Sequence, residues 1–269
     1  MSVWFVPRDA AARSIGADAV ASALEARGET VIRNGSRGML WMEPLIERAD
    51  DRHGPRVGWS NVTEGQINAG LPDEQSDNFM GAVEEVDYLA KQNRWIYERV
   101  GITDPVDPED FVAHGGLTGL KNALAMSGGD VVQSVTDSGL RGRGGAGFPA
   151  GIKWRTVADQ PPVPHAGESQ NAPAHKYICV NADEGDSGTF ADRMLIEGDP
   201  FCLLEGMTIA AHAVGADRGL VYLRSEYPDA IATLQSAIRI AREQGWLGDN
   251  ILGSELCFDV EIRVGAGSY

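Results

Sequence analysis

The chain has 269 residues, of which 43% are hydrophobic and 23% charged, a composition typical of globular proteins with one or two domains. Its formal net charge of −16 argues against a nucleic-acid partner, because nucleic-acid binding rewards a basic surface. No apolar run approaches the roughly 20 residues of a membrane span, and the start lacks the features of a signal peptide. We therefore expect a cytoplasmic protein without direct membrane insertion.

Residues 1–76 are predicted to form a small domain of strands and helices. Strands are expected at 2–7, 30–35, 38–48 and 55–62, with an Ala-rich helix at 9–29 and a closing helix at 63–71. This order is compatible with a thioredoxin-like fold. The segment contains no cysteine, so it lacks both the C-x-x-C pair of a redox enzyme and the ligands of an iron–sulfur cluster. A docking role is the expectation that remains.

Residues 77–114 are predicted to be a helical linker. A polar-faced helix is expected at 78–101, and Pro105 and Pro108 punctuate the segment after it.

Residues 115–269 show an alternating pattern after two short predicted helices at 117–127 and 129–140. Strands are expected at 176–181, 218–226 and 257–267, and helices at 200–215 and 228–245. This βαβαβ order predicts an α/β domain with a Rossmann-like parallel sheet. Its ligands are expected beyond the carboxyl ends of the strands.

The segment 138–154, "SGLRGRGGAGFPAGIKW", contains G-x-G-x-x-G. A dinucleotide fingerprint follows an apolar strand and opens a long helix, whereas here a helical segment precedes the glycines, and Pro149 and Gly151 are expected to interrupt any helix after them. The standard fingerprint is therefore set aside. Successive glycine amides can still turn toward one point and cradle an anion, with Arg141, Arg143 and Lys153 adding positive charge. A mobile surface turn is the alternative.

Metal-ligand spacings are absent from the sequence. The three cysteines, Cys179, Cys202 and Cys257, lie far apart, and the five histidines show neither H-x-x-x-H nor H-E-x-x-H. No metal site is expected in this chain, and no histidine stands out as a catalytic base.

Four motifs together resemble the flavin-binding, NADH-oxidising subunit family of respiratory complex I. They are the glycine segment, "VNADEGDSGTFADR", "RSEYP" and the final "GAGSY". NAD-reducing hydrogenases and NAD-dependent formate dehydrogenases contain the same module. The cysteine-free N-terminal appendage, "KWRT" after the loop and Asp186 within "NADEGDSGTF" favour the beta subunit of molybdenum- or tungsten-containing formate dehydrogenase.

The resemblance implies that the chain binds FMN and uses NAD(H) as its substrate, with the chemistry on the flavin and no catalytic side chain. The implied cofactor-binding residues are Gly142, Arg143, Gly144, Gly145, Gly147, Lys153, Asn181, Asp183, Glu184 and Tyr269. Phe148 and Asp186 are implied to contact NADH. The family position of Asp186 is typically Glu, and that of Thr156 is often aromatic, so the carboxylate is shorter here and one adenine-stacking partner is missing.

The resemblance also implies partners that carry iron–sulfur clusters and molybdopterin, or the corresponding hydrogenase or complex I subunits. The sequence stops at Tyr269 inside a family motif, so we expect a truncated chain whose [4Fe–4S] cysteines belong to the missing C-terminal part. A non-catalytic nucleotide-binding scaffold is the alternative from another functional class.

Overall fold

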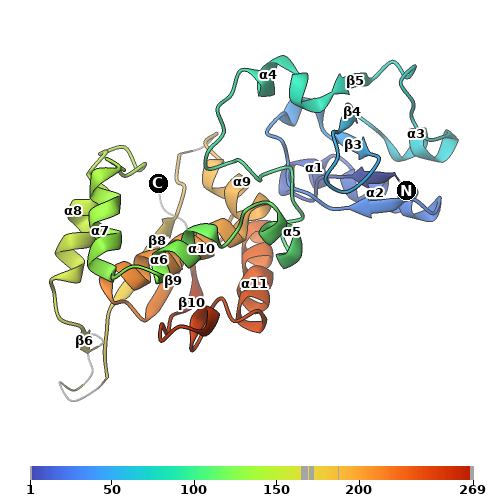
Figure 1. Cartoon of the computed structure of the whole chain (residues 1–269). Helices are drawn as coiled ribbons and strands as arrows, with labels where there is room; N and C mark the ends of the chain where they lie inside the picture. Colours follow the sequence, from blue (N-terminus) through green and yellow to red (C-terminus); the bar gives the residue numbers. More distant parts are fainter. Residues whose placement is uncertain (1, 165–168, 170–172, 187, 267–269) are drawn as a thin grey trace. The chain divides into compact units, whose positions relative to one another are not determined.

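The computed structural model describes residues 2–164, 169, 173–186 and 188–266 (Figure 1). The chain forms two compact units, the first of residues 1–114 with 190–200 and the second of residues 115–189 with 201–269. In the described part of the chain, no helix is both long enough and apolar enough to cross a bilayer. The domain bounds expected from the sequence, at 76 and 114, stay a prediction.

The first unit contains a five-stranded mixed sheet in the order β2-β1-β3-β4-β5. Its strands are β1 (Val3–Phe5), β2 (Thr30–Ile32), β3 (Ile46–Ala49), β4 (Val57–Trp59) and β5 (Phe79–Ala82). β1 pairs in parallel with β2, and the other neighbours pair antiparallel. From β1 to α3 the order is β-α-α-β-β-β-α, so each of the four expected strands and the closing helix overlaps an observed element, and β5 follows them. The thioredoxin-like fold stays a prediction.

The helices of the first unit are short. They are α1 (Ala10–Ser14), α2 (Ala17–Ala26), α3 (Glu64–Ala69), α4 (Asp87–Ala90), α5 (Pro108–Ala113) and α9 (Ala191–Gly198), with 3₁₀ turns η1 (Leu40–Met42) and η2 (Val83–Glu85). Thr63 and Gln66 form a capping box that starts α3.

Three sequence expectations for this unit were wrong. The single helix at 9–29 is broken into α1 and α2, because Gly16 adopts the left-handed region at φ 109°. The strand expected at 38–48 begins only at Ile46, after the 3₁₀ turn η1. The helix expected at 78–101 is replaced by β5, η2 and α4, because residues 79–82 pair with β4 instead of forming a helix.

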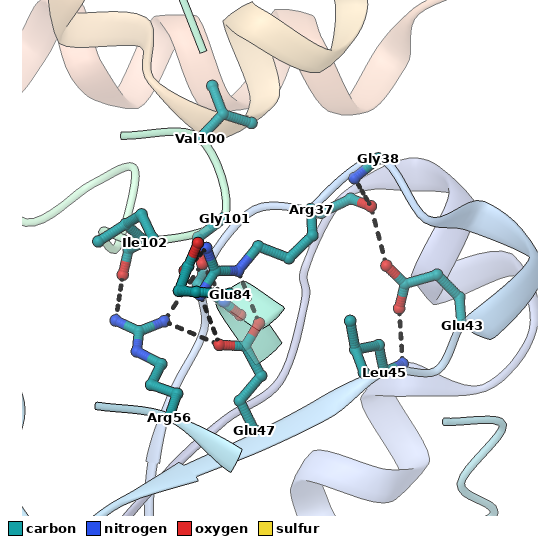
Figure 2. A network of polar contacts seen from close by, with 12 residues as sticks. Arg37, Gly38, Glu43, Leu45, Glu47, Arg56, Glu84, Val100, Gly101 and Ile102 are labelled. Atoms are coloured by element: carbon teal, nitrogen blue, oxygen red, sulfur yellow. Dashed lines mark hydrogen bonds and ion pairs between the residues drawn. The ribbon is translucent and has the colours of Figure 1, made fainter. Parts of the chain in front are cut away.

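Two kinds of interaction hold the first unit together. Trp4 and Trp59 lie with ring centroids 5.4 Å apart in a core formed by the sheet and α2. A buried ion network lies beside this core (Figure 2). Arg37 binds both carboxylate oxygens of Glu47 at 2.8 Å, and Arg56 reaches the same carboxylate at 3.3 Å. Burial would raise the pKa of Glu47, but these two guanidinium groups outweigh it and hold the pKa below its usual range.

The second unit contains a parallel sheet in the order β10-β9-β8, which confirms the expected α/β class. Its strands are β8 (Tyr177–Ala182), β9 (Arg218–Arg224) and β10 (Asp259–Gly265), joined through α10 (Pro200–Val214) and α11 (Pro228–Glu243). The remaining elements are α6 (Thr118–Leu124), α7 (Gly128–Asp137), α8 (Ala150–Ala158), η3 (Ile251–Gly253) and the two-residue strands β6 (Val163–Pro164) and β7 (Ala174–His175).

The two faces of the β8–β10 sheet differ in burial. Val221 and Leu223 of β9 are fully buried, whereas Tyr222 between them is 44% exposed. Asn181, paired with Tyr222 in the ladder, is also exposed. The alternation therefore leaves one face of the sheet open near the carboxyl ends of its strands.

Candidate functional site

The glycine segment forms a loop between α7 and α8, and hydrogen bonds between residues 140–142 and 147–150 close its base, here called the neck. Gly142 N–H donates to Phe148 O at 2.8 Å, and Ala150 N–H donates to Leu140 O at 2.9 Å. Arg141 Nε also donates across the neck, to Gly147 O at 2.6 Å. These bonds fix both ends of the loop and leave its tip, residues 143–146, projecting into solvent.

Two glycines of the loop have a backbone conformation that residues with a side chain rarely adopt. Gly145 and Gly147 are left-handed, at φ 94° and 60°. A Cβ built on Gly144 or on Gly145 would meet no atom within 4 Å. The glycines at these two positions are therefore not explained by packing inside the chain, and the tip leaves room for another molecule to approach its main chain.

Helix α8 begins immediately after the loop, which corrects the expectation that Pro149 and Gly151 interrupt a helix there. Pro149 is the N-cap residue, a place where the missing N–H of proline costs little. Gly151 lies inside the helix because α7 passes so close that a Cβ there would stand 2.2 Å from Thr136 Oγ1. Both helices therefore support the loop, but a helix and not a strand precedes it.

Basic and aromatic side chains surround the loop. Arg143 and Lys153 are exposed, and the Phe148 side chain is 50% exposed beside the neck. The N-terminal end of α8 adds partial positive charge at the same place. The loop is therefore suited to an anionic group with a flat ring system beside it.

The acidic motif lies at the carboxyl end of β8. Asn181 is the last exposed residue of the strand, and its side-chain Oδ1 accepts from Asp183 N–H at 3.1 Å. Glu184 Oε2 accepts from Tyr227 OH at 3.2 Å, and the Glu184 carbonyl accepts from Arg224. The structure thus brings Asn181, Asp183 and Glu184 together at one strand end.

Arg224 belongs to this cluster at the strand ends, and the sequence analysis did not single it out. It ends β9, and besides Glu184 it binds Glu226 at 3.1 Å. The hydrogen bond to Glu226 raises the pKa of Arg224, and the same bond lowers the pKa of Glu226. The motif "RSEYP" could have indicated this residue, because Arg224 lies near the end of a predicted strand and the carboxylate of Glu226 follows two residues later. Glu226 and Tyr227 brace the sheet end through their contacts with Arg224 and Glu184.

Two further residues were predicted to belong to the site, Asp186 and Tyr269. Asp186 is exposed in the turn after β8, where its Oδ2 accepts from Thr189 Oγ1 at 3.0 Å. Tyr269 lies outside the described residues.

The loop and the strand ends belong to the same compact unit. Lys176 Nζ, just before β8, donates to the carbonyl of Ala158 at the C-terminal end of α8 at 3.0 Å. Helix α8 therefore has its C-terminal end at the start of β8. In Figure 1 the loop joining α7 and α8 lies at the end of the unit toward which β8 and β9 run.

Comparisons with known proteins identify several relatives of the chain. The chain is 46% identical over 179 residues to the NADP-reducing hydrogenase subunit HndC of Solidesulfovibrio fructosivorans, covering 66% of this chain and 34% of that protein. It is 45% identical over 160 residues to an NADH-quinone oxidoreductase subunit of Rhizobium meliloti, covering 59% and 35%. It is 41% identical over 166 residues to an NADH-quinone oxidoreductase subunit of Escherichia coli, covering 61% and 35%.

The matches thus span about a third of the length of these curated relatives. The family comparison covers residues 135–269, which include the glycine loop, the acidic motif and the whole parallel sheet, and this is the family described as the Nuo51 FMN-binding domain. The chain belongs to the Nuo51 FMN-binding domain family.

Proposed function

We propose that this chain is an FMN-binding electron-transfer module that exchanges hydride with NAD(H) and electrons with iron–sulfur partners. The observation that carries the proposal is the open tip of the glycine loop, inside the segment that matches an FMN-binding family. The names of the relatives, an NADP-reducing hydrogenase subunit and NADH-quinone oxidoreductase subunits, support a nicotinamide substrate.

The residues present fit FMN at the loop. Side chains at Gly144 and Gly145 would fill the space next to the main chain, so their absence leaves a cradle for the flavin or its phosphate. Arg143 and Lys153, both exposed, would offset the phosphate charge. Gly142 and Gly147 would hold the two sides of the loop in this conformation.

The acidic motif fits the uncharged part of the cofactor. Carboxylate and amide oxygens repel phosphate but accept hydrogen bonds from hydroxyl and ring N–H groups. We propose that Asn181, Asp183 and Glu184 orient the ribityl chain and the isoalloxazine ring in this way. Phe148 and Asp186 are proposed to contact NADH, by stacking and by accepting hydrogen bonds.

When bound, FMN supplies the conversion between two-electron hydride transfer and one-electron transfer. The chain then needs no acid or base of its own, and its residues act by binding and orientation. Arg224 holds the Glu184 carbonyl and so fixes the strand end on which these oxygens lie.

We further propose that the module is the beta, or diaphorase, subunit of an NAD-dependent formate dehydrogenase, with molybdopterin and iron–sulfur subunits as partners in the cytoplasm. The support is the cysteine-free first unit, the shorter carboxylate Asp186 and Thr156 in "KWRT". The equivalent subunits of complex I and of NAD-reducing hydrogenase are the alternatives that the relatives favour. Affinity purification from the native host distinguishes them by the co-purifying subunit.

A flavin titration of the purified chain tests the loop. We expect quenching of FMN fluorescence by the native chain and at least about a tenfold weaker affinity in Gly144→Leu, because the added side chain occupies the cradle. Gly206→Leu is the matched control, since a Cβ at Gly206 of α10 also meets no atom within 4 Å. Equal affinities of the two variants would remove the loop from the site.

Anaerobic addition of NADH to the FMN-loaded chain tests the redox role. Bleaching of the flavin absorbance near its visible maximum is expected. A chain that binds FMN without bleaching, or that takes up no FMN, would instead support the non-catalytic scaffold.

A further inference from the structure

A histidine–aspartate–histidine cluster lies in the first unit, away from the family segment. His53 belongs to the connection between β3 and β4, while Asp110 and His114 come from α5 and the residue that caps it. One potential ligand atom from each of the three side chains lies within 4.8 Å of the other two. The two imidazole rings have centroids 5.2 Å apart.

Helix α5 places two of these groups on one face. Asp110 and His114 are four residues apart, a spacing that stacks side chains on successive helical turns. His114 Nδ1 lies 2.9 Å from the main-chain carbonyl of Asp110. When Nδ1–H donates to that carbonyl, Nε2 keeps its lone pair, which is the arrangement found in metal-binding histidines.

Asp110 supplies an independent observation that points to a ligand. Its side chain is 2% exposed, and Oδ2 accepts from Arg52 Nη2 at 3.0 Å and from Asp104 N–H at 2.9 Å. Oδ1 is buried and has no hydrogen-bond donor among the described residues. His114 Nδ1 lies 3.2 Å from Oδ1, but it is directed at the Asp110 carbonyl. A buried carboxylate oxygen without a donor costs free energy that a bound cation would offset.

The charge around the cluster also favours a cation. Arg52 Nη2 is shared between two carboxylates, Asp107 at 2.6 Å and Asp110 at 3.0 Å. His114 lies at the C-terminal end of α5, where the helix dipole is negative.

We propose that His53, Asp110 and His114 bind a borderline divalent metal ion of the Zn²⁺ class, with water completing the coordination. Two imidazoles and one carboxylate are the donor set that such ions prefer. Tetrahedral coordination needs donor atoms roughly 3.4 Å apart, and the three ligand atoms lie within 4.8 Å of one another, so the cluster must close by at most about 1.4 Å. His53 is exposed, and its movement would allow this closure. The ion would join the β3–β4 connection to α5.

Zn²⁺ titration of the metal-free full chain by calorimetry tests the proposal. We expect a strong site with one Zn²⁺ per chain, and at least about a tenfold loss of affinity in His53→Ala and in His114→Ala. Co²⁺ should give visible absorption bands of low-coordinate type that both variants lose. His53→Ala is the variant safest for folding, because its side chain is exposed.

His212→Gln is the matched control, because it removes a histidine of the second unit that bonds Met126 O. It should bind Zn²⁺ as the native chain does. Binding that survives His53→Ala and His114→Ala, or that only His212→Gln removes, would overturn the proposal. So would the absence of a strong site in the native chain.

Discussion

Glu43 is a buried carboxyl group whose protonation affects the stability of the first unit. It is 3% exposed, and it receives hydrogen bonds from Ser36 Oγ and Leu45 N–H, both at 2.8 Å (Figure 2). Burial raises its pKa from the ordinary 4.5 to about 8, and the nearby Asp9 adds to the effect. The folded chain therefore holds a proton on Glu43 at neutral pH that the unfolded chain has already released.

The sign of the pH dependence follows from this difference. The contribution of protonated Glu43 to the free energy of unfolding is fully present below pH 4.5. It is lost as the pH rises to about 8, and the loss amounts to at most about 5 kcal/mol. Glu43→Gln cannot ionise and keeps the shape of the protonated carboxyl. We expect its free energy of unfolding to exceed that of the native chain increasingly between pH 5 and about 8, as measured by urea unfolding at several pH values.

The exposed Glu74→Gln is the control for the Glu43 experiment, because its side chain stands in water in both states. A difference between Glu43→Gln and the native chain that does not change with pH would contradict the raised pKa.

The close packing of α7 against α8 supports the glycine loop that joins them. At Gly151 a Cβ would lie 2.6 Å from the main-chain Cα of Thr136, so a change of side-chain rotamer cannot relieve the clash. Gly151→Ala is expected to separate the helices and to cost about 1–3 kcal/mol in urea unfolding, in spite of the better helix propensity of alanine.

Gly206→Ala gives the opposite expectation for the same chemical change. It lies in α10 with no atom within 4 Å of its Cβ, so it should stabilise the chain by about 0.5–1 kcal/mol. Destabilisation of equal size in both variants would show that crowding at α7 is not the cause.

Elements with a clear periodicity of hydrophobic residues were predictable from the sequence. Elements that depend on which strands pair with each other were not. The three parallel strands and α10 and α11 follow from alternating apolar segments, and they were found. Residues 78–101 have a helical composition, yet 79–82 form β5, because β4 offers an unpaired edge. The break at Gly16 needed the left-handed conformation of that residue, which composition does not reveal.

The candidate site was predictable where a motif concentrates its residues. The glycine loop and the acidic motif are each continuous in sequence, so their clusters were found from composition and resemblance. Arg224 was missed because its partner Glu184 belongs to another motif. The metal-ligand candidates are not visible as a His–His spacing in the sequence, because α5 pairs Asp110 with His114 and His53 joins them only in the fold.

At the scale of the whole molecule, the chain passes between its two units more than once. Residues 190–200 return to the first unit after the chain has formed β8 of the second. Several contacts hold the returning segment within the first unit, among them the following two. Glu197 accepts from Ala10 N–H at 2.8 Å, and Asp199 binds Arg99 at 2.9 Å. A chain cut after residue 114 would therefore lose part of the first unit, and its remaining residues should be less stable than in the whole protein.

The Arg99–Asp199 ion pair tests this dependence without cutting the chain. Its side chains are 15% and 2% exposed, so Asp199→Asn leaves a largely buried guanidinium facing a neutral group and should cost about 3 kcal/mol. Hydrogen exchange is expected to accelerate in β1 and β3, whereas β9 of the second unit should keep its protection. Asp87→Asn breaks an exposed pair with Lys91, 88% and 73% exposed, and should change stability by less than about 0.5 kcal/mol. Unchanged exchange in β1 after Asp199→Asn would mean that residues 1–114 hold their fold without the returning segment, and the first unit would then be separable by a single cut.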